Sequence, residues 1–410
     1  MSKPKIRFKG YEEDWEQRKF GNVTELKSAS RVHKEEWTTS GVPFYRSSDV
    51  MAAINGTENE KVYISEALYE KLSSISGKLE AGDVLVTGGG SVGKPYIVPN
   101  NEPLYTKDAD LLWIKNQGKF HPYFLYEFFF TPTFRSYLSS ISHVGTIAHY
   151  TITQLSETPI CLPSVGEQQK IGDYFYNIDH LITLHQRKCE ETKKLKKYML
   201  QKMFPQNGKR VPEIRFVGFT EDWEQRKLGD IAEFSKGSGY SKGDLIESGT
   251  PIILYGRLYT KYETSISEVD TYVEAKDGSV YSKGGEVIVP ASGETAEDIA
   301  RAATVDKSGV ILGGDLNVVS PNEDINSAFL AISISHGNSQ RELAKKAQGK
   351  SIVHIHNEEI KNLVVPFPTK AEQNKIVEYL SSLDNLITLH QRKYEELQKI
   401  KKFMLQNMFI

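Results

Sequence analysis

The chain contains few cysteines, no long hydrophobic run and almost no net charge. Its 410 residues include two cysteines, which are too few for a disulfide framework or a cysteine-based zinc site and favour a reducing, cytoplasmic location. No apolar stretch approaches the roughly 20 residues that a membrane-spanning helix requires. The first residues, Met1–Arg7, lack the apolar core of a signal peptide. We therefore expect no contact with a membrane.

The near balance of charges excludes a polycation. Lys and Arg number 51 and Asp and Glu number 53, which leaves a formal net charge of −2. Contacts with nucleic acid must therefore come from local basic patches. One such patch spans residues 187–202, where basic residues outnumber Glu190 and Glu191. A solvated helix face is the alternative explanation of this run.

Motifs of catalysis are scarce. The sequence has no G-x-S-x-G elbow, and His354 and His356 lack a third ligand at a spacing typical of a metal site. It also lacks the Asn/Asp-Pro-Pro-Tyr/Phe tetrapeptide of amino-methyltransferases and any helicase or nuclease motif set. We therefore predict a chain without catalytic activity and without a cofactor of its own.

Gly88–Lys94 imitates a nucleotide-binding motif. These residues match G-x-x-x-x-G-K and follow a predicted strand, as in a phosphate-binding loop. However, Pro95 stands where the motif requires a Ser or Thr hydroxyl, and Tyr96–Pro99 reads as a strand where the phosphate-binding helix should begin. We interpret this stretch as a glycine-rich hairpin tip, which allows a ligand such as DNA to approach the backbone.

A long repeated segment organises the chain. Leu181–Lys188 returns letter for letter at Leu386–Lys393. Around both copies, packable residues alternate at spacings of 4 and 3, which is the seam of a heptad helix. Because a long helix with one apolar stripe needs a partner, we expect the two helices to pack on each other. The alternative is that each helix covers only its own globule. The seam residues are Ile171, Phe175, Ile178, Ile182, His185, Cys189 and Thr192, and Ile376, Leu380, Leu383, Ile387, His390, Tyr394 and Leu397.

A second repeated segment opens each half of the chain. Asp14–Lys19 returns as Asp222–Lys227, and predicted strands and helices follow both copies. The predicted fold class is α+β, with two globular domains in pseudo-twofold tandem, each followed by a long helix, and with the two helices packed as an antiparallel coiled coil. The predicted strands include Val42–Tyr45, Asp83–Val86, Thr250–Leu254 and Glu286–Val289, the shorter helices cover 121–138 and 327–348, and the predicted domains are 1–165, 166–205, 206–370 and 371–410.

Polar residues in the loops at strand ends are the candidate DNA-binding residues. Arg can bind guanine through two hydrogen bonds, Ser and Asp can read other base edges, and Lys and Gln can contact phosphates. For each residue the alternative is an ordinary solvated loop side chain. The candidates are Arg46, Ser47, Ser48, Asp49, Thr87, Gly88, Gly89, Ser91, Lys94, Thr146 and His149, and Tyr255, Gly256, Arg257, Ser292, Gly293, Glu294, Thr295, Lys346, Gln348, Lys350 and His354.

Taken together, the repeated helices and their entries closely resemble the specificity subunit of type I restriction-modification enzymes. Trp15–Gly21 and Trp223–Gly229 are similar to the openings of that family's target recognition domains. Glu167–Phe204 and Glu372–Phe409 resemble its spacer helices. The resemblance covers the whole chain, although the globules match mainly in layout.

The resemblance implies a DNA-binding function and a set of partners. Each target recognition domain would read one half of a split, asymmetric sequence in double-stranded DNA. The chain would dock two copies of the methyltransferase (modification) subunit and, in the full complex, motor-nuclease (restriction) subunits. S-adenosylmethionine, ATP and Mg²⁺ would bind to those partners. Two other functions stay open from the residues alone, a protein-only scaffold and a nucleotide-binding enzyme at Gly88–Lys94.

Overall fold

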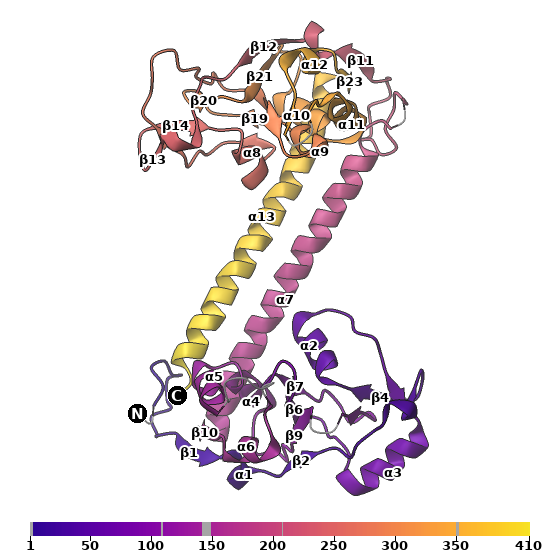
Figure 1. The fold of residues 1–410 in the computed structure, drawn as a ribbon, viewed down its shortest axis with the longest axis vertical. Helices are drawn as coiled ribbons and strands as arrows, with labels where there is room; N and C mark the ends of the chain where they lie inside the picture. The colour runs from indigo at the N-terminus through magenta and orange to yellow at the C-terminus, as the bar shows by residue number, and fades with distance from the viewer. Residues whose placement is uncertain (1–2, 108–109, 142–148, 207, 350–351) are drawn as a thin grey trace. The chain divides into compact units, whose positions relative to one another are not determined.

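The computed structural model describes residues 3–107, 110–141, 149–206, 208–349 and 352–410 (Figure 1). The chain divides into two compact units. The first comprises Met1–Gln186 and Gln391–Ile410, and the second comprises Arg187–His390. Each unit therefore contains one globule together with a section of each of two long helices.

The two long helices are α7, Val165–Lys202, and α13, Lys370–Asn407, of 38 residues each. Neither contains an internal proline, and good helix formers fill both. In the second unit, Lys196 Nζ lies 2.5 and 2.7 Å from the carboxylate oxygens of Asp384. The Cys189 thiol lies 3.8 Å from the carbonyl oxygen of Ile387. Because the partner's residue number falls as that of α7 rises, the two sections run antiparallel.

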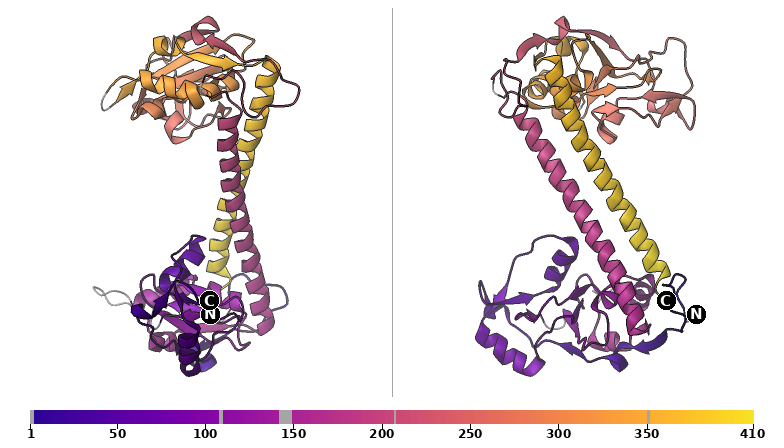
Figure 2. Two further views of the ribbon diagram at one scale, coloured as in Figure 1. Left: turned by 90° about the vertical axis from the view of Figure 1, so that its right-hand side faces the viewer. Right: turned by 180° about the vertical axis from the view of Figure 1, so that it is seen from behind.

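The first unit repeats this arrangement. Lys401 Nζ lies 2.7 Å from both carboxylate oxygens of Asp179. This ion pair is the counterpart of Lys196–Asp384, because both members are displaced by the same 205 positions. The predicted antiparallel coiled coil is thus confirmed, and the paired helix sections can be followed in the further views (Figure 2).

The first turns of each long helix cover the core of the helix's own globule, which was the alternative to helix–helix packing. Ile171 and Phe175 of α7 belong to the core of the first globule, whereas Ile376, Leu380 and Leu383 of α13 belong to the core of the second. Each seam therefore begins inside its own globule and continues along the partner helix.

Two four-stranded sheets form the first globule. The strand orders are β2-β9-β6-β7 and β3-β5-β4-β8, and β1 pairs with β10 beside them. The predicted strands at 42–45 and 83–86 are confirmed as β4 and β6, and the helical passage is interrupted at Pro132 as expected. The elements are β1 Glu16–Lys19, α1 Phe20–Val23, β2 Leu26–Ser28, η1 Lys34–Glu36, β3 Trp37–Thr38, β4 Val42–Tyr45, α2 Ser47–Asn55, β5 Tyr63–Ile64, α3 Glu66–Ser76, β6 Val84–Thr87, β7 Pro95–Ile97, β8 Tyr105–Thr106, β9 Leu111–Ile114, α4 Pro122–Phe128, α5 Pro132–Ile141, α6 Ile152–Glu157 and β10 Pro159–Leu162.

The second globule has a five-stranded sheet in the order β12-β21-β17-β19-β15 and a four-stranded sheet in the order β13-β16-β14-β20. Helix α10 packs on β17 and β19 (Figure 1). The predicted strands at 250–254 and 286–289 are confirmed as β14 and β17. The elements are β11 Glu224–Lys227, η2 Leu228–Asp230, β12 Ala232–Lys236, η3 Lys242–Asp244, β13 Leu245–Ile246, β14 Thr250–Ile253, α8 Arg257–Thr260, β15 Ser265–Ile266, β16 Tyr272–Val273, β17 Glu286–Pro290, β18 Ser292–Gly293, α9 Ala296–Ile299, β19 Ala303–Val305, β20 Ile311–Leu312, β21 Leu316–Pro321, α10 Ser327–Ser335, α11 Gly337–Lys346, β22 Val353–His354, α12 Asn357–Lys361 and β23 Val364–Phe367.

The repeated Glu-Gln pair at the start of each long helix has a structural role. Glu167 is buried and forms two hydrogen bonds with the Arg7 guanidinium, at 2.6 and 2.8 Å, and Glu372 forms the same pair with Arg215 at 2.8 and 2.7 Å. The following glutamine accepts a hydrogen bond from the backbone at the start of α4 or α10. These contacts fix each long helix to its globule, which explains why this short sequence recurs.

The distal end of each long helix fills an aromatic socket. In the first unit, Phe409 at the end of α13 stacks on Phe124 at 5.2 Å and meets Trp15 edge-on at 6.3 Å. In the second unit, Phe204 beyond α7 stacks on Phe329 at 5.6 Å and meets Trp223 edge-on at 5.9 Å. Each globule therefore packs the start of one long helix and the end of the other.

Candidate nucleic-acid interface

Arg46 and Asp49 start helix α2 at the end of strand β4. The backbone amide of Arg46 donates to Asp49 Oδ2 at 2.8 Å, and the guanidinium Nε donates to the same oxygen at 3.0 Å. The guanidinium also lies over the Trp37 ring. The polar groups of Arg46 and Asp49 are thus occupied inside the fold, whereas Ser48 stays at the surface of this loop.

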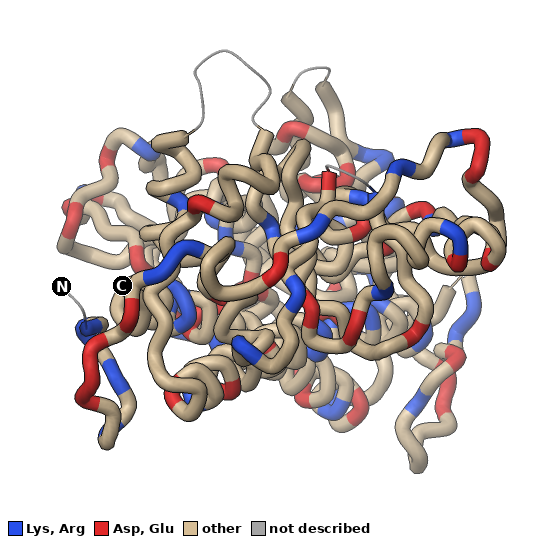
Figure 3. The backbone as a smooth tube through the Cα atoms, turned by 90° about the horizontal axis from the view of Figure 1, so that it is seen from below, with Lys and Arg blue, Asp and Glu red and all other residues tan. Residues whose placement is uncertain are grey.

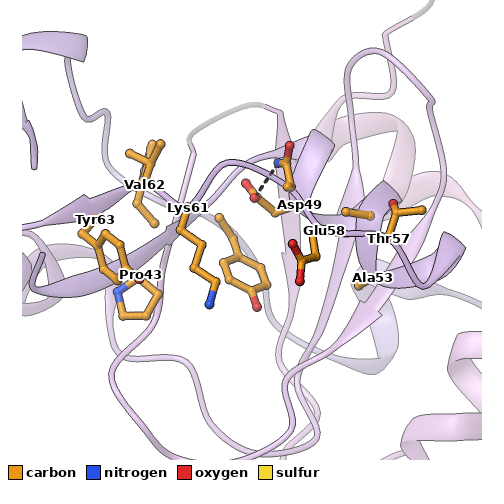
Figure 4. A pocket seen from close by; sticks show the side chains of 12 residues that line it. Pro43, Asp49, Ala53, Thr57, Glu58, Lys61, Val62 and Tyr63 are labelled. Atoms are coloured by element: carbon orange, nitrogen blue, oxygen red, sulfur yellow. Dashed lines mark hydrogen bonds between the residues drawn. The ribbon is translucent and has the colours of Figure 1, made fainter. Parts of the chain in front are cut away.

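A cleft of about 530 Å³ lies beside this loop. Asp49 lines it and accepts a hydrogen bond of 2.7 Å from the Asn59 side chain (Figure 4). Glu58 and Lys61 are exposed and line the same cleft, so opposite charges meet there. This mixed lining does not by itself favour a polyanion.

Residues 88–94 form the turn between β6 and β7. Thr87 is fully buried, and its hydroxyl donates to the Ser91 carbonyl and accepts from the Lys94 amide. The predicted strand after Lys94 is confirmed as β7, so no phosphate-binding helix follows. Lys94 lies over the Phe130 ring, and burial, with a smaller contribution from Arg135, lowers its pKa. The lysine is therefore half-buried against an aromatic ring.

The corresponding loop of the second globule contains Tyr255, Gly256 and Arg257. Arg257 is buried and its guanidinium donates to Asp270 at 2.7 Å and to Glu263 at 2.8 Å, so it holds the loop together. Tyr255 is 38% exposed and borders a cleft of about 800 Å³, which Asp315 also lines. Arg257 lines the same cleft with its guanidinium paired inside the loop, and Tyr255 keeps an accessible ring. The predicted DNA contacts of both residues stay predictions.

The second polar loop follows strand β17. Ser292 faces His354, with 3.2 Å between the hydroxyl and Nδ1. Thr295 caps helix α9 through the Asp298 amide at 3.1 Å, whereas Glu294 is exposed. Of the expected phosphate contacts, Lys346 ends α11 and reaches the Asn362 carbonyl at 3.4 Å, and Gln348 exchanges backbone hydrogen bonds with His354. Thr146 and Lys350 lie outside the described residues.

Two aspartates that the sequence reasoning missed lie between these loops. The carbonyl of Asp110 accepts hydrogen bonds from the Gly88 amide at 2.8 Å and from the Ser47 hydroxyl at 3.0 Å. Asp315 accepts from the Ala291 amide at 2.7 Å. Each aspartate directly precedes a strand, and the two are 205 positions apart, the same offset as the long helices. That offset was the signal that could have identified them.

The described residues contain no cluster of three or more His, Cys, Asp or Glu side chains arranged to hold a metal ion. Over the same part of the chain, no helix is both long and apolar enough to cross a membrane. Acidic and basic residues are interspersed along the backbone (Figure 3). The surface therefore offers local groups for recognition, and the net charge of −2 provides no general attraction to DNA.

This architecture defines a class of protein. Two repeated globules have polar loops at equivalent strand ends, and each globule packs the start of one long helix and the end of the other. The chain belongs to the type I restriction modification DNA specificity domain family, whose profile matches residues 12–194 and again residues 220–399. Its two globules are target recognition domains, and members of this family are non-catalytic subunits that work with DNA, methyltransferase subunits and restriction subunits.

Individual relatives agree with this assignment. The specificity subunit of the type I restriction enzyme MjaVIII from Methanocaldococcus jannaschii is 24% identical over 290 residues, which cover 68% of this chain and 67% of the relative. The crystal structure of a type I restriction-modification S subunit from M. genitalium has a TM-score of 0.61 at 15% identity and covers 100% of this chain and 99% of its own. A chain from a structure of the type I system reaches a TM-score of 0.50 at 16% identity, with 96% and 97% covered. The two structural likenesses show a shared fold.

Proposed function

We propose that this chain reads a split DNA sequence of two unlike half-sites, one with each globule. The observation that carries the proposal is a contrast between two parts of each globule. The contacts to the long helices are alike in both globules, whereas the loops at the strand ends differ. The contacts that anchor the long helices repeat in both halves, as in Arg7–Glu167 and Arg215–Glu372. The loops at the ends of β6 and β17 differ, because Gly88–Gly90 stands where the second globule has Ala291–Gly293. Two equivalent supports with unlike readers suit an asymmetric target.

The long helices supply a surface for two copies of the methyltransferase subunit. The seam continues at the same spacings of 4 and 3 to Lys196 and Met199 on α7 and to Lys401 and Met404 on α13. On both helices, exposed apolar residues stand one position before residues of this seam. In an antiparallel pair, such positions flank the same side of the seam. Leu181, Ile400 and Phe403 form this stripe in the first unit, and their counterparts Leu386, Leu195 and Tyr198 form it in the second. A stripe of 40–55% exposed apolar side chains suits a partner helix.

The two stripes support a stoichiometry of two. One chain with an internal repeat offers two near-equivalent docking surfaces, as a symmetric dimer would. In this proposal the modification subunits bring S-adenosylmethionine and methylate adenine, and restriction subunits with ATP and Mg²⁺ join the assembly. This chain contributes sequence recognition and no reacting group.

Exchange of one reader tests the proposal. We expect that replacing residues 22–160 by the equivalent segment of another specificity subunit, in complex with the modification subunits, changes one half of the methylated sequence and leaves the other half and the gap unchanged. Mapping of methylated adenines in cellular DNA measures this. A change in both halves would contradict independent reading, and an unmodified complex without any sequence preference would indicate a protein-only scaffold.

A further inference from the structure

The two globules contain the same backbone frame at the end of their central strands. In the first, the Gly88 amide donates to the Asp110 carbonyl at 2.8 Å, and the Tyr150 amide donates to the Gly88 carbonyl at 2.8 Å. In the second, Ala291 makes the corresponding bonds with Asp315 at 2.7 Å and with Ile355 at 3.1 Å. In the first globule, this frame places Asp110 and His149 on either side of Gly89. In the second globule, it places Asp315 and His354 on either side of Ser292.

In the second globule the three residues form a connected cluster. The Ser292 hydroxyl donates to Asp315 Oδ2 at 3.3 Å and lies 3.2 Å from His354 Nδ1. Ser292 and His354 are also cross-strand partners in the β18–β22 ladder. His354 is exposed, and Nε2 on its ring has no hydrogen-bond partner among the residues that the structure describes.

The chemistry of these groups favours one histidine tautomer. A carboxylate can only accept, and a serine hydroxyl has one hydrogen to donate. When that hydrogen goes to Asp315, the arrangement favours the tautomer in which Nδ1 of His354 carries the proton and donates it to Ser292. The neutral imidazole then presents Nε2 as an acceptor. The cluster therefore holds a preset acceptor on an exposed ring.

The backbone of Asp315 adds a second, independent observation. Its φ is 58°, in the left-handed region that residues other than glycine seldom adopt. Such a conformation is unfavourable and persists only where the surrounding structure holds it, often at binding sites. Here the bond from the Ala291 amide and the start of strand β21 hold it. The carboxylate is thereby kept beside Ser292 and at the edge of the cleft that Tyr255 lines.

The first globule has the same aspartate and histidine without the hydroxyl. A Cβ atom added to Gly89 would lie 3.1 Å from Asp110 Oδ1 and 3.9 Å from His149 Nδ1. Gly89 therefore occupies the place of Ser292, and His149 is exposed like His354. Asp110 is instead held by Lys107 at 2.5 Å. Among the residues that the structure describes, none forms a hydrogen bond with the His149 ring that would set its tautomer.

We propose that His354, preset by Ser292 and Asp315, reads the exocyclic amine of an adenine or a cytosine in the second half-site. The inference rests on the proposed function and names the reader within it. In the major groove, adenine N6 and cytosine N4 donate hydrogen bonds, whereas guanine presents two acceptors and thymine one. An acceptor at Nε2 can accept a hydrogen bond from adenine or cytosine, whereas guanine and thymine would place an acceptor against it. His149 occupies the same place in the first globule and reads with less discrimination.

The test uses the full chain assembled with its modification subunits and a duplex library with randomised half-sites. In the unmodified complex, one position of the second half-site should favour adenine or cytosine. His354→Ala should reduce the preference at that position about tenfold, with the first half-site unchanged. His356→Ala is the matched control, because that ring is parallel and 6.5 Å away but lacks the bond to Ser292, and it should preserve the preference.

A variant that gains a preference for a different base distinguishes base recognition by His354 from misfolding of the second globule. His354→Lys replaces the acceptor by a donor, so the same position should turn towards guanine, which a merely misfolded domain would not produce. Ser292→Gly removes the favoured tautomer and should weaken discrimination between amine and carbonyl bases. The reciprocal Gly89→Ser should sharpen one position of the first half-site, since the hydroxyl would meet Asp110 and His149.

The outcomes distinguish this inference from the proposed function. If the unmodified complex selects a split sequence but His354→Ala and His354→Lys leave every position unchanged, the inference is overturned and the function stands. If the unmodified complex selects no sequence at all, the proposed function fails first.

Discussion

At the scale of single residues, the most unusual group is the buried carboxylate of Glu127 on α4. The side chain is fully buried, and Oε1 lies 2.8 Å from the Lys401 ammonium, which Asp179 also binds. Burial raises the pKa of Glu127 to about 8, although Lys401 lowers it. The equivalent position of the second unit is Ile332, one turn after Phe329 as Glu127 follows Phe124. One globule thus buries an ionisable group where the other buries a hydrocarbon.

This difference predicts a pH-dependent stability. A folded-state pKa above the unfolded value of about 4.5 means that the folded chain retains a proton that the unfolded chain releases. The stability of the first unit should therefore fall as the pH rises from about 4.5 to about 8. Glu127→Ile should remove this loss and stabilise the first unit by roughly 3 kcal/mol at pH 8.5 and by little at pH 5. Urea unfolding followed by hydrogen exchange in α4 measures it.

The reverse substitution in the other unit provides the control. Ile332→Glu places a carboxylate near Lys196 and should destabilise the second unit, more at pH 8.5 than at pH 5. The prediction fails if Glu127→Ile changes the stability by the same amount at pH 5 and at pH 8.5. In that case, titration of Glu127 does not cause the stability difference.

At the scale of elements, the aromatic sockets determine where the helix ends dock. Phe409 contacts the Trp15, Phe124 and Phe175 rings. Phe409→Ala should destabilise the docking of the last turns of α13 by about 3–5 kcal/mol, because a buried aromatic ring leaves a cavity. Hydrogen exchange and limited proteolysis should then increase within residues 391–410.

Phe204→Ala is the matched variant in the second unit. It should loosen the end of α7 within residues 187–204 and leave residues 391–410 protected. Equal deprotection of both helix ends by either variant would contradict two separate sockets.

The elements also show how far the sequence predicts the structure. The heptad spacing located both long helices, and the predicted strands Asp83–Val86 and Glu286–Val289 located β6 and β17. The readers were harder to predict, because the partners of a side chain are distant in sequence. For Arg257, the sequence does not show that Asp270 and Glu263 pair with its guanidinium. Asp315 was missed because it approaches Ser292 only through the pairing of β17 with β21.

At the scale of the whole molecule, the proposed function makes helix length a measure of half-site spacing. Inserting one heptad into both helices, after Arg187 and after Arg392, adds about 10 Å to each and preserves the seam. Since successive base pairs are about 3.4 Å apart, the gap between the half-sites should lengthen by roughly three base pairs. Methylation mapping reads the gap directly.

The design of the insertion includes its own control. A heptad inserted into only one helix shifts the pairing of Lys196 with Asp384 and should impair folding instead of changing the gap. Paired insertions that fold and dock normally but leave the gap unchanged would remove the idea that the helices set the spacing.

The exchange of helix ends between the two halves has a consequence for biosynthesis. The Ile6 amide donates to the Asn407 carbonyl at 2.9 Å, and Met408 and Phe409 belong to the same core as Trp15. The core around Trp15 therefore closes only after residues 407–409, almost 400 positions later, have been synthesised. A transcript cut short, or a translation stopped near residue 390, would release a first reader with an open socket, exposed to proteases. Only chains that include Met408 and Phe409 can complete the core of the first globule. Truncated chains should therefore be degraded faster than chains that contain these residues.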